Sequence, residues 1–293
     1  MEIKVEAGDI AQSPAKAIIV NLFEGVTTPA GGTGAVDKAL DGGISALIKE
    51  GEIKGKGGEM TVVHSLGKIA SPRVIVAGLG KQPDFGYKQI KDLIGTALRR
   101  VRAAGGTSAA TIVHGAGIAG LDPEQSGQAI AEGAVMGSYR FRRYKSAAAG
   151  KDGEESNLPE IETLTIVEQD KSKLRALQRG VERGTILGTA ANHTRDLANE
   201  PANALPPVVF AERARALAKD ADLECEILND GQLKQMGMGA LLGVGIGSAQ
   251  PPRFIIIKYE GDKRSKKTLG LLGKGITFDS GGSASSRRRG WRR

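Results

Sequence analysis

The residues best suited to chemistry are Lys274 and Asp279, which lie five positions apart in the glycine-rich stretch GKGITFDSGG. This stretch follows an apolar run, residues 268–272, that predicts a buried strand. The amine and the carboxylate would therefore lie in a loop where a strand ends. By residue type and spacing alone, the pair is typical of a loop ion pair between an ammonium and a carboxylate.

The whole stretch resembles the metal-binding signature of the leucyl aminopeptidase (cytosol aminopeptidase) family. The segment TRDLANEPAN at residues 194–203 resembles the opening of that family's catalytic domain, and GGTGAVDKAL at 31–40 and VIVAGLGK at 74–81 resemble parts of its N-terminal domain. The similarity extends through Gly282. It implies a two-metal hydrolase that releases N-terminal residues, often leucine, from peptides.

The resemblance also implies roles for the two candidate residues. Asp279 matches the family's bridging metal ligand, and Lys274 matches an amine ligand of one ion; the family's ions are zinc or manganese. Two such ions acidify a bridging water and polarise the substrate carbonyl. A lysine coordinates a metal only after losing its proton, and because its free pKa is about 10.4, the site must supply a nearby cation and partial burial.

The family's pattern continues after the double glycine with a segment like ISIKP, whose Lys is catalytic, and later with NTDAEGR, whose Arg is catalytic. Here residues 283–293 read SASSRRRGWRR instead. We therefore expect a chain truncated after the first metal-binding motif, with no catalytic residue, no tightly bound metal and no activity alone. The codons of ISIKP, read one base late, encode Ser-Ala-Ser-Ser-Arg, so residues 283–293 are interpreted as a frameshifted, Arg-rich tail.

Two other functions remain open. The family's N-terminal domain is similar in topology to macro domains, which bind ADP-ribose, and the segment Gly31-Gly32-Thr33-Gly34 has the composition of a phosphate nest. A tight loop before a helix is the simpler interpretation of these glycines. The alternatives are thus a module that binds a nucleotide-like ligand, or a structural subunit, because the family forms homo-hexamers.

The three histidines are not expected to bind metal. His64 and His114 each end an apolar run, and His193 lies in a helix-compatible segment, so each is interpreted as a structural histidine. The family's metal site uses no histidine, which agrees with this interpretation.

The elements that must position the site alternate between strand-like and helix-like periodicity, which predicts an α/β fold with a parallel or mixed sheet. A helix at residues 84–104 has apolar residues at helical spacing and a stop at Gly105, and another helix begins at Asp122. Residues 146–159 predict a surface excursion. The predicted strands of this half are residues 17–23, 73–79, 109–114 and 161–167.

The second half predicts a helix-compatible segment at 171–197, ended by Asn199-Glu200-Pro201, and a glycine-punctuated segment at 237–247. A helix at 207–219 and strands at 223–228, 254–259 and 268–272 complete it. With the resemblance, this implies four parts. They are a macro-domain-like N-terminal domain (1–168), a connecting helix (169–198), the start of an incomplete α/β catalytic domain (199–282) and the tail (283–293).

Composition limits the classes of partner. The single Cys225 excludes a disulfide framework, and the N-terminus lacks a signal peptide's basic start and long apolar run, so we expect a cytoplasmic protein with no membrane contact. Five tail arginines supply most of the net charge of +8 and leave +3 without them, which argues against specific nucleic-acid binding. The cluster Arg140, Arg142 and Arg143 is interpreted as solvated surface. Peptides are the expected substrates.

Overall fold

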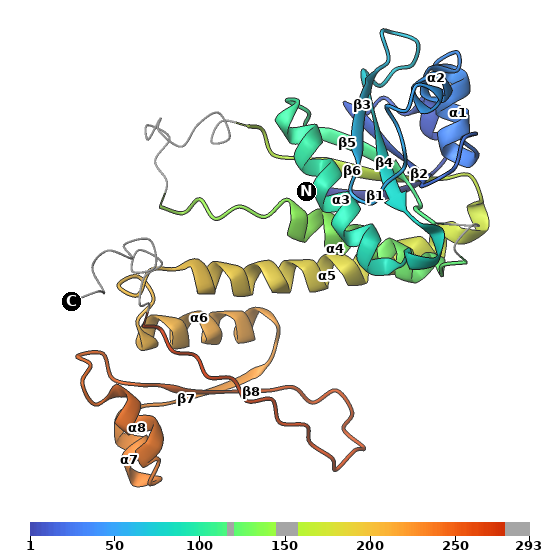
Figure 1. Cartoon of the computed structure of the whole chain (residues 1–293). Helices are drawn as coiled ribbons and strands as arrows, with labels where there is room; N and C mark the ends of the chain where they lie inside the picture. Colours follow the sequence, from blue (N-terminus) through green and yellow to red (C-terminus); the bar gives the residue numbers. More distant parts are fainter. Residues whose placement is uncertain (116–119, 145–157, 279–293) are drawn as a thin grey trace, which may run out of the picture. The chain divides into compact units, whose positions relative to one another are not determined.

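The computed structural model describes residues 1–115, 120–144 and 158–278 (Figure 1). The chain divides into two compact units, Met1–Arg195 and Asp196–Arg293. Both are built from alternating strands and helices, which confirms the predicted α/β class. The division falls inside one long helix, α5 (Leu174–Asn199).

The first unit contains a six-stranded sheet with the order β1-β6-β5-β2-β4-β3. All neighbouring strands are parallel except β3 and β4, which pair antiparallel, so the sheet is mixed as predicted. The strands are β1 (Glu2–Ala7), β2 (Ala17–Phe23), β3 (Met60–His64), β4 (Arg73–Gly80), β5 (Ser108–Ile112) and β6 (Thr163–Glu168). The described helices besides α5 are α1 (Gly31–Ala39), α2 (Gly43–Lys49), α3 (Tyr87–Ala103) and α4 (Pro123–Gly137), with short 3-10 turns such as Ile10–Gln12.

Two apolar clusters fill the two faces of this sheet. One contains the buried faces of α3 and α4 together with side chains such as Ile19, Ile75 and Leu164. The other contains α1, α2 and the 3-10 turn together with Ile18 and Val76. Because β2 and β4 are buried on both faces, they are continuous apolar runs rather than alternating ones.

Glycines let the helices of this unit approach closely. A Cβ built on Gly180 of α5 would lie 1.9 Å from the carbonyl oxygen of Glu124 in α4. One built on Gly137 of α4 would lie 2.3 Å from the Cα of Gly95 in α3. The predicted start of α4 is also present, since the Asp122 carboxylate accepts from the Gln125 backbone N–H at 2.8 Å.

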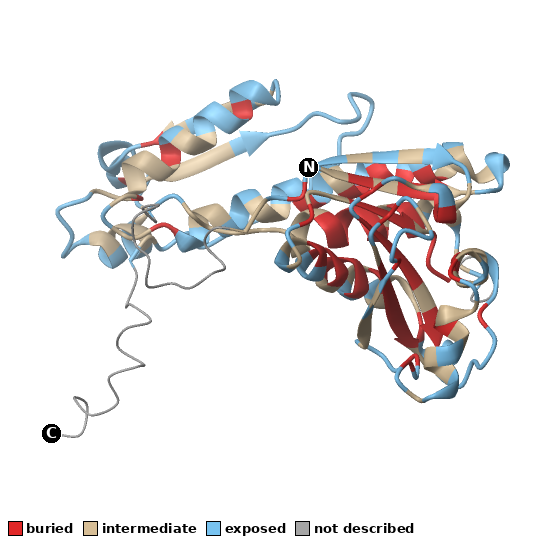
Figure 2. Cartoon of the chain, turned by 90° about the horizontal axis from the view of Figure 1, so that it is seen from above, coloured by how far each residue is buried: buried red, intermediate tan, exposed pale blue. Residues whose placement is uncertain are grey.

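The second unit is smaller and more open. It contains α6 (Pro207–Asp220), β7 (Glu224–Leu228), α7 (Asp230–Gln235), α8 (Gly239–Gly245) and β8 (Phe254–Lys258). The strands β7 and β8 form an antiparallel two-stranded sheet that packs on α6. Figure 2 shows how buried residues gather in the sheet and helices of the first unit, whereas β7 except Leu228, β8 and residues 259–278 are intermediate or exposed.

Two predicted elements are wrong, and the structure contains further elements that were not predicted. Residues 268–272 form no strand, because a strand needs a ladder partner and the described residues offer none beside this segment. The segment 31–34 is not a loop before a helix but the first turn of α1. The glycine-punctuated segment at 237–247 contains α8, and the edge strands β1 and β3 were not predicted. Most of the excursion at 146–159 and the whole tail lie outside the described residues.

Candidate metal centre

Lys274 lies in an exposed stretch, residues 273–278, that has neither helical nor strand hydrogen bonding. Within this stretch Gly275 lies close to α6, because a Cβ built on it would lie 2.8 Å from Cε1 of Phe210. Asp279 lies outside the described residues, so the structure does not show the geometry between the two predicted ligands.

The described residues contain no group of three or more His, Cys, Asp or Glu side chains that could hold a metal ion. A two-ion centre needs several carboxylate oxygens close together. Within the described ranges the donor set therefore does not fit a pair of divalent ions, and no catalytic step through a metal follows from it.

The segment TRDLANEPAN is held to α6 by a buried ion pair that the sequence did not predict. The Glu200 carboxylate is fully buried and accepts from the Arg213 guanidinium at 2.7 Å. The charge-assisted bond compensates the cost of burying the carboxylate. The only sequence signal was an acidic residue directly before the proline that ends α5. The pair links the residue just after α5 to α6.

A second unpredicted network surrounds His114, which is completely buried beside the ends of β2 and β5. Its Nδ1 lies 2.8 Å from Nδ2 of Asn21, and its Nε2 lies 2.8 Å from Oγ1 of Thr111. The Thr33 hydroxyl donates to the Asn21 carbonyl at 2.7 Å and so ties α1 to the same place. Burial lowers the pKa of His114 to about 3. The prediction of a structural, hydrogen-bonded histidine is confirmed for His114; the signal for the network was Asn21, a polar residue inside an apolar strand.

The other two histidines differ from His114. His64 at the end of β3 and His193 in α5 are both exposed, so neither is a buried structural residue. The glycines of the proposed phosphate nest have a packing explanation: a Cβ on Gly32 would lie 2.7 Å from Ile112, and one on Gly34 would lie 2.9 Å from the carbonyl oxygen of Pro29.

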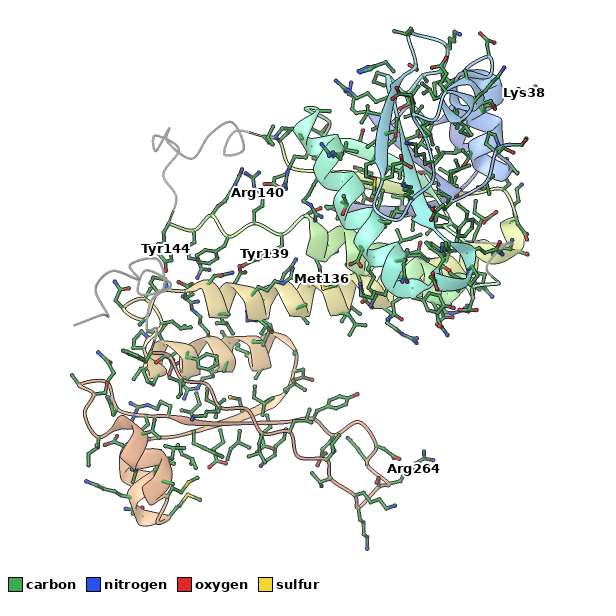
Figure 3. The ribbon with its side chains drawn as sticks, viewed as in Figure 1. Lys38, Met136, Tyr139, Arg140, Tyr144 and Arg264 are labelled. Carbon is green, nitrogen blue, oxygen red and sulfur yellow. The ribbon has the colours of Figure 1, made fainter. Side chains whose placement is uncertain are left out.

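The arginine cluster is less solvated than predicted. Arg140 and Arg142 both approach Oε1 of Glu160, at 3.5 and 3.4 Å, and the Arg140 side chain is only 17% exposed. Figure 3 labels Tyr139, Arg140 and Tyr144 along the extended segment that follows α4. Arg195 of α5 stacks over Tyr139 with 5.5 Å to the ring centroid, so this segment is fastened to the first unit.

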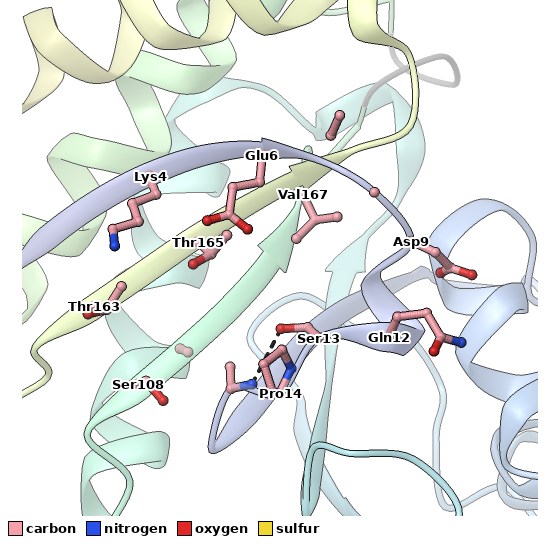
Figure 4. A pocket seen from close by; sticks show the side chains of 14 residues that line it. Lys4, Glu6, Asp9, Gln12, Ser13, Pro14, Ser108, Thr163, Thr165 and Val167 are labelled. Atoms are coloured by element: carbon pink, nitrogen blue, oxygen red, sulfur yellow. Dashed lines mark hydrogen bonds between the residues drawn. The ribbon is translucent and has the colours of Figure 1, made fainter.

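A groove of about 450 Å³ lies on the first unit (Figure 4). It is lined by polar side chains of β1 and β6, among them Lys4, Glu6, Thr163 and Thr165, and by the loop that contains Asp9. It contains no residue of the GKGITFDSGG stretch.

Comparison with known proteins identifies the family of the chain. The sequence profile of the cytosol aminopeptidase family, N-terminal domain, matches residues 19–148, and the profile of the same family's catalytic domain matches residues 192–288. The chain belongs to the cytosol aminopeptidase family. Both predicted metal ligands, Lys274 and Asp279, lie within the part that matches the catalytic domain of this family.

Curated relatives in the cytosol aminopeptidase family are longer. The chain is 34% identical to the probable cytosol aminopeptidase of Alkaliphilus oremlandii, over 96% of this chain and 55% of the relative. It is 32% identical to that of Geobacter sulfurreducens, over all of this chain and 57% of the relative. The chain therefore spans about half the length of the curated relatives that it matches.

Solved structures agree with the family's fold. A mutant of tomato leucine aminopeptidase superposes with a TM-score of 0.79 at 24% identity, covering 96% of this chain and 55% of that one. The bottromycin maturation enzyme BotP in complex with Mn superposes with a TM-score of 0.64 at 25% identity, covering 84% of this chain and 45% of that one. No described helix is long and apolar enough to cross a membrane.

Proposed function

We propose that this chain is the N-terminal half of a metal-dependent aminopeptidase that releases N-terminal residues, often leucine, from peptides. The observation that supports the proposal is the ordered match of both cytosol aminopeptidase domain profiles, with GKGITFDSGG inside the second. Zinc or manganese as the metal, peptides as substrates, a homo-hexameric assembly and a cytoplasmic location are parts of this proposal. The cytosol aminopeptidases among the relatives support peptides as substrates, and the similar BotP complex with Mn supports manganese as the metal.

Within this proposal, the chain supplies the N-terminal domain and the first two metal ligands, Lys274 and Asp279. The remaining carboxylates and the catalytic Lys and Arg belong to the family's later motifs. A lone Lys and Asp cannot hold two ions, and so the chain is expected to bind metal weakly and to cleave nothing alone.

Hydrolysis of leucine p-nitroanilide with added manganese or zinc tests the proposal. The chain alone is expected to show no turnover above buffer. A protein completed in frame after Gly282 with the remainder of the Alkaliphilus oremlandii relative is expected to be active. Within the completed protein, Asp279→Ala should lose most of the activity. The control Asp262→Ala, at an exposed residue that contacts Arg264 and Ser265 of its own turn, should keep it.

Two results would contradict the proposal. One is turnover by the chain alone that disappears in Asp279→Ala. The other is a completed protein that is folded and metal-loaded but inactive. Activity that survives Asp279→Ala in the completed protein would show that the metal site does not depend on Asp279.

A further inference from the structure

One face of the sheet in the first unit is covered over only part of its width. Val5 of β1 and Ile166 of β6 are register partners and pack in the apolar cluster under α3 and α4. The residues on either side of them in each strand therefore point to the opposite face. On that face, the cluster that contains α1, α2 and the 3-10 turn includes no residue of β1 and only Val167 of β6. Within the described part of the chain, β1 and β6 thus present an uncovered face of mainly polar side chains.

This uncovered face is hollowed, and the hollow is the groove of about 450 Å³ shown in Figure 4. Its volume is typical of sites that hold small molecules. The strands line it with Thr163, Thr165 and Ser108, and the loop after β1 lines it with residues 8, 9 and 12–15. Neither threonine hydroxyl bonds to any residue that the structure describes, so both can bond to a ligand. We call this hollow the polar groove.

Charges of opposite sign follow one another along the polar groove. Lys4 and Glu6 are two residues apart on the same face of β1, so their Cα atoms are roughly 6.6 Å apart. Glu6 forms no ion pair with a described residue, and Asp9 uses only Oδ1, which accepts from the Ala11 backbone N–H at 3.0 Å. Lys4 pairs with Glu2 at 3.3 Å, but both side chains are largely exposed. An ion pair this exposed contributes little, so Lys4 can accept a second carboxylate.

We propose that the polar groove binds a free α-amino acid. The carboxylate of the ligand contacts the Lys4 ammonium, and the ammonium group of the ligand contacts the Glu6 carboxylate. Two charge-assisted hydrogen bonds of about 2.8 Å each, joined through one α-carbon, span the interval between the two side chains. The hydroxyls of Thr163 and Thr165 supply further polar contacts, and Pro14 supplies apolar surface for the side chain of the ligand.

Ligands with a single kind of charge fit the groove less well. A phosphate would meet the carboxylates of Glu6 and Asp9, while Lys4 is the one cationic side chain among the described residues of the lining. A metal ion would lie beside the Lys4 ammonium, which repels it. A zwitterion satisfies both signs. An α-amino acid is also what the proposed peptidase releases, so in such an enzyme the groove would bind product through residues other than Lys274 and Asp279.

Titration of the whole, isotope-labelled chain with L-leucine, followed by amide NMR shifts, tests the inference. We expect saturable shifts in β1 and β6 with a dissociation constant on the order of 1 mM, as suits two charge-assisted contacts in an open groove. Leucinamide lacks the carboxylate and N-acetylleucine lacks the ammonium group. Each is expected to bind about fivefold more weakly or worse. The inference rests on the geometry of the groove and not on peptidase activity, so no substrate is needed.

Variants assign each charge of the ligand to one residue. Lys4→Met should weaken leucine about fivefold or more and leave leucinamide unchanged, because leucinamide has no carboxylate to lose. Glu6→Gln should weaken leucine similarly and leave N-acetylleucine unchanged. The control is Lys38→Met, at an exposed lysine of α1 that does not line the groove (Figure 3), and it should bind leucine normally. Lys4 and Glu6 are exposed, so both variants should fold, and unchanged amide shifts in β4 check this.

Four outcomes would overturn the inference. They are the absence of saturable shifts in β1 and β6, equal binding of leucine and its two derivatives, equal effects of Lys4→Met and Lys38→Met, and shifts confined to residues 273–278. Tighter binding of leucylglycine than of leucine would replace the single amino acid by a peptide and overturn the proposed ligand class. Leucine binding as described, with a completed protein that cleaves nothing, would support the groove and contradict only the proposed activity.

Discussion

The buried His114 gives the chain a stability that depends on pH. In the neutral imidazole, Nδ1 accepts from the Asn21 amide and Nε2–H donates to the Thr111 hydroxyl, and both contacts are 2.8 Å. A protonated ring carries N–H groups on both nitrogens, and so Nδ1–H would face a donor. Burying the charged ring without an acidic partner costs more free energy than this lost hydrogen bond. Burial therefore lowers the pKa of His114 from its ordinary value of 6.5 to about 3.

Acid destabilises the fold because, as the pH falls, the unfolded chain protonates His114 before the folded chain does. In the unfolded chain His114 titrates near 6.5, while in the folded chain it stays neutral until the pH approaches 3. The stability is therefore fully present above pH 6.5 and is lost as the pH falls from there toward 3. At about 1.4 kcal/mol per pKa unit, the full loss is about 5 kcal/mol, and roughly 2 kcal/mol of it is lost between pH 7 and pH 5.

Urea unfolding at pH 7 and pH 5 measures this loss. The difference in the free energy of unfolding between the two pH values is compared for the unaltered chain, His114→Gln and His64→Gln. His114→Gln is expected to reduce the acid-induced loss by about 2 kcal/mol, whatever its effect at pH 7, because the variant cannot take up the proton. The exposed His64 is the control and should leave the loss unchanged. An equal acid-induced loss in the unaltered chain and His114→Gln would refute the reasoning.

Three further predictions concern packing, charge and local stability. Gly180→Ala should destabilise the first unit by about 1–3 kcal/mol or more, because the Cβ would overlap the Glu124 carbonyl, whereas Gly43→Ala, with only an ordinary contact at 3.6 Å, should be neutral in the same urea titration. Lys91→Met should cost roughly 1–2 kcal/mol because it leaves the buried Glu132 carboxylate without its cation, while Lys88→Met on the same helix removes only an exposed pair and should cost at most about 0.5 kcal/mol; equal costs would contradict the role of burial. Hydrogen exchange should be far slower in β4 than in β8, which has one partner strand and half-exposed side chains, and equal protection would show that the second unit is as stable as the first.

The sequence predicted the elements whose signals are local. The apolar spacing of α3 and its stop at Gly105, the capping of α4 by Asp122, and the continuous apolar runs of β2 and β4 all appear as expected. The edge strand β1 was missed because its side chains alternate with charges and are mostly exposed. The glycines at 31–34 were assigned to a loop because glycine usually interrupts helices, whereas here close packing against Ile112 and Pro29 requires it.

Some features of the candidate site were likewise predicted from local sequence, and others were not. The motif identified the family and named Lys274 and Asp279, since a ten-residue pattern needs no geometry to be recognised. The motif did not predict the ion pair of Glu200 with Arg213, or the hydrogen bonds of His114, because partners far apart in sequence meet only after folding.

The sequence by itself determined the α/β class, the main helices and buried strands, and membership of the cytosol aminopeptidase family. Only the tertiary structure decided that residues 268–272, apolar and strand-like, form no strand and leave three leucines exposed. The physical reason is that a helix forms its hydrogen bonds within its own segment, so local sequence can specify it, whereas a strand exists only when another segment lies beside it.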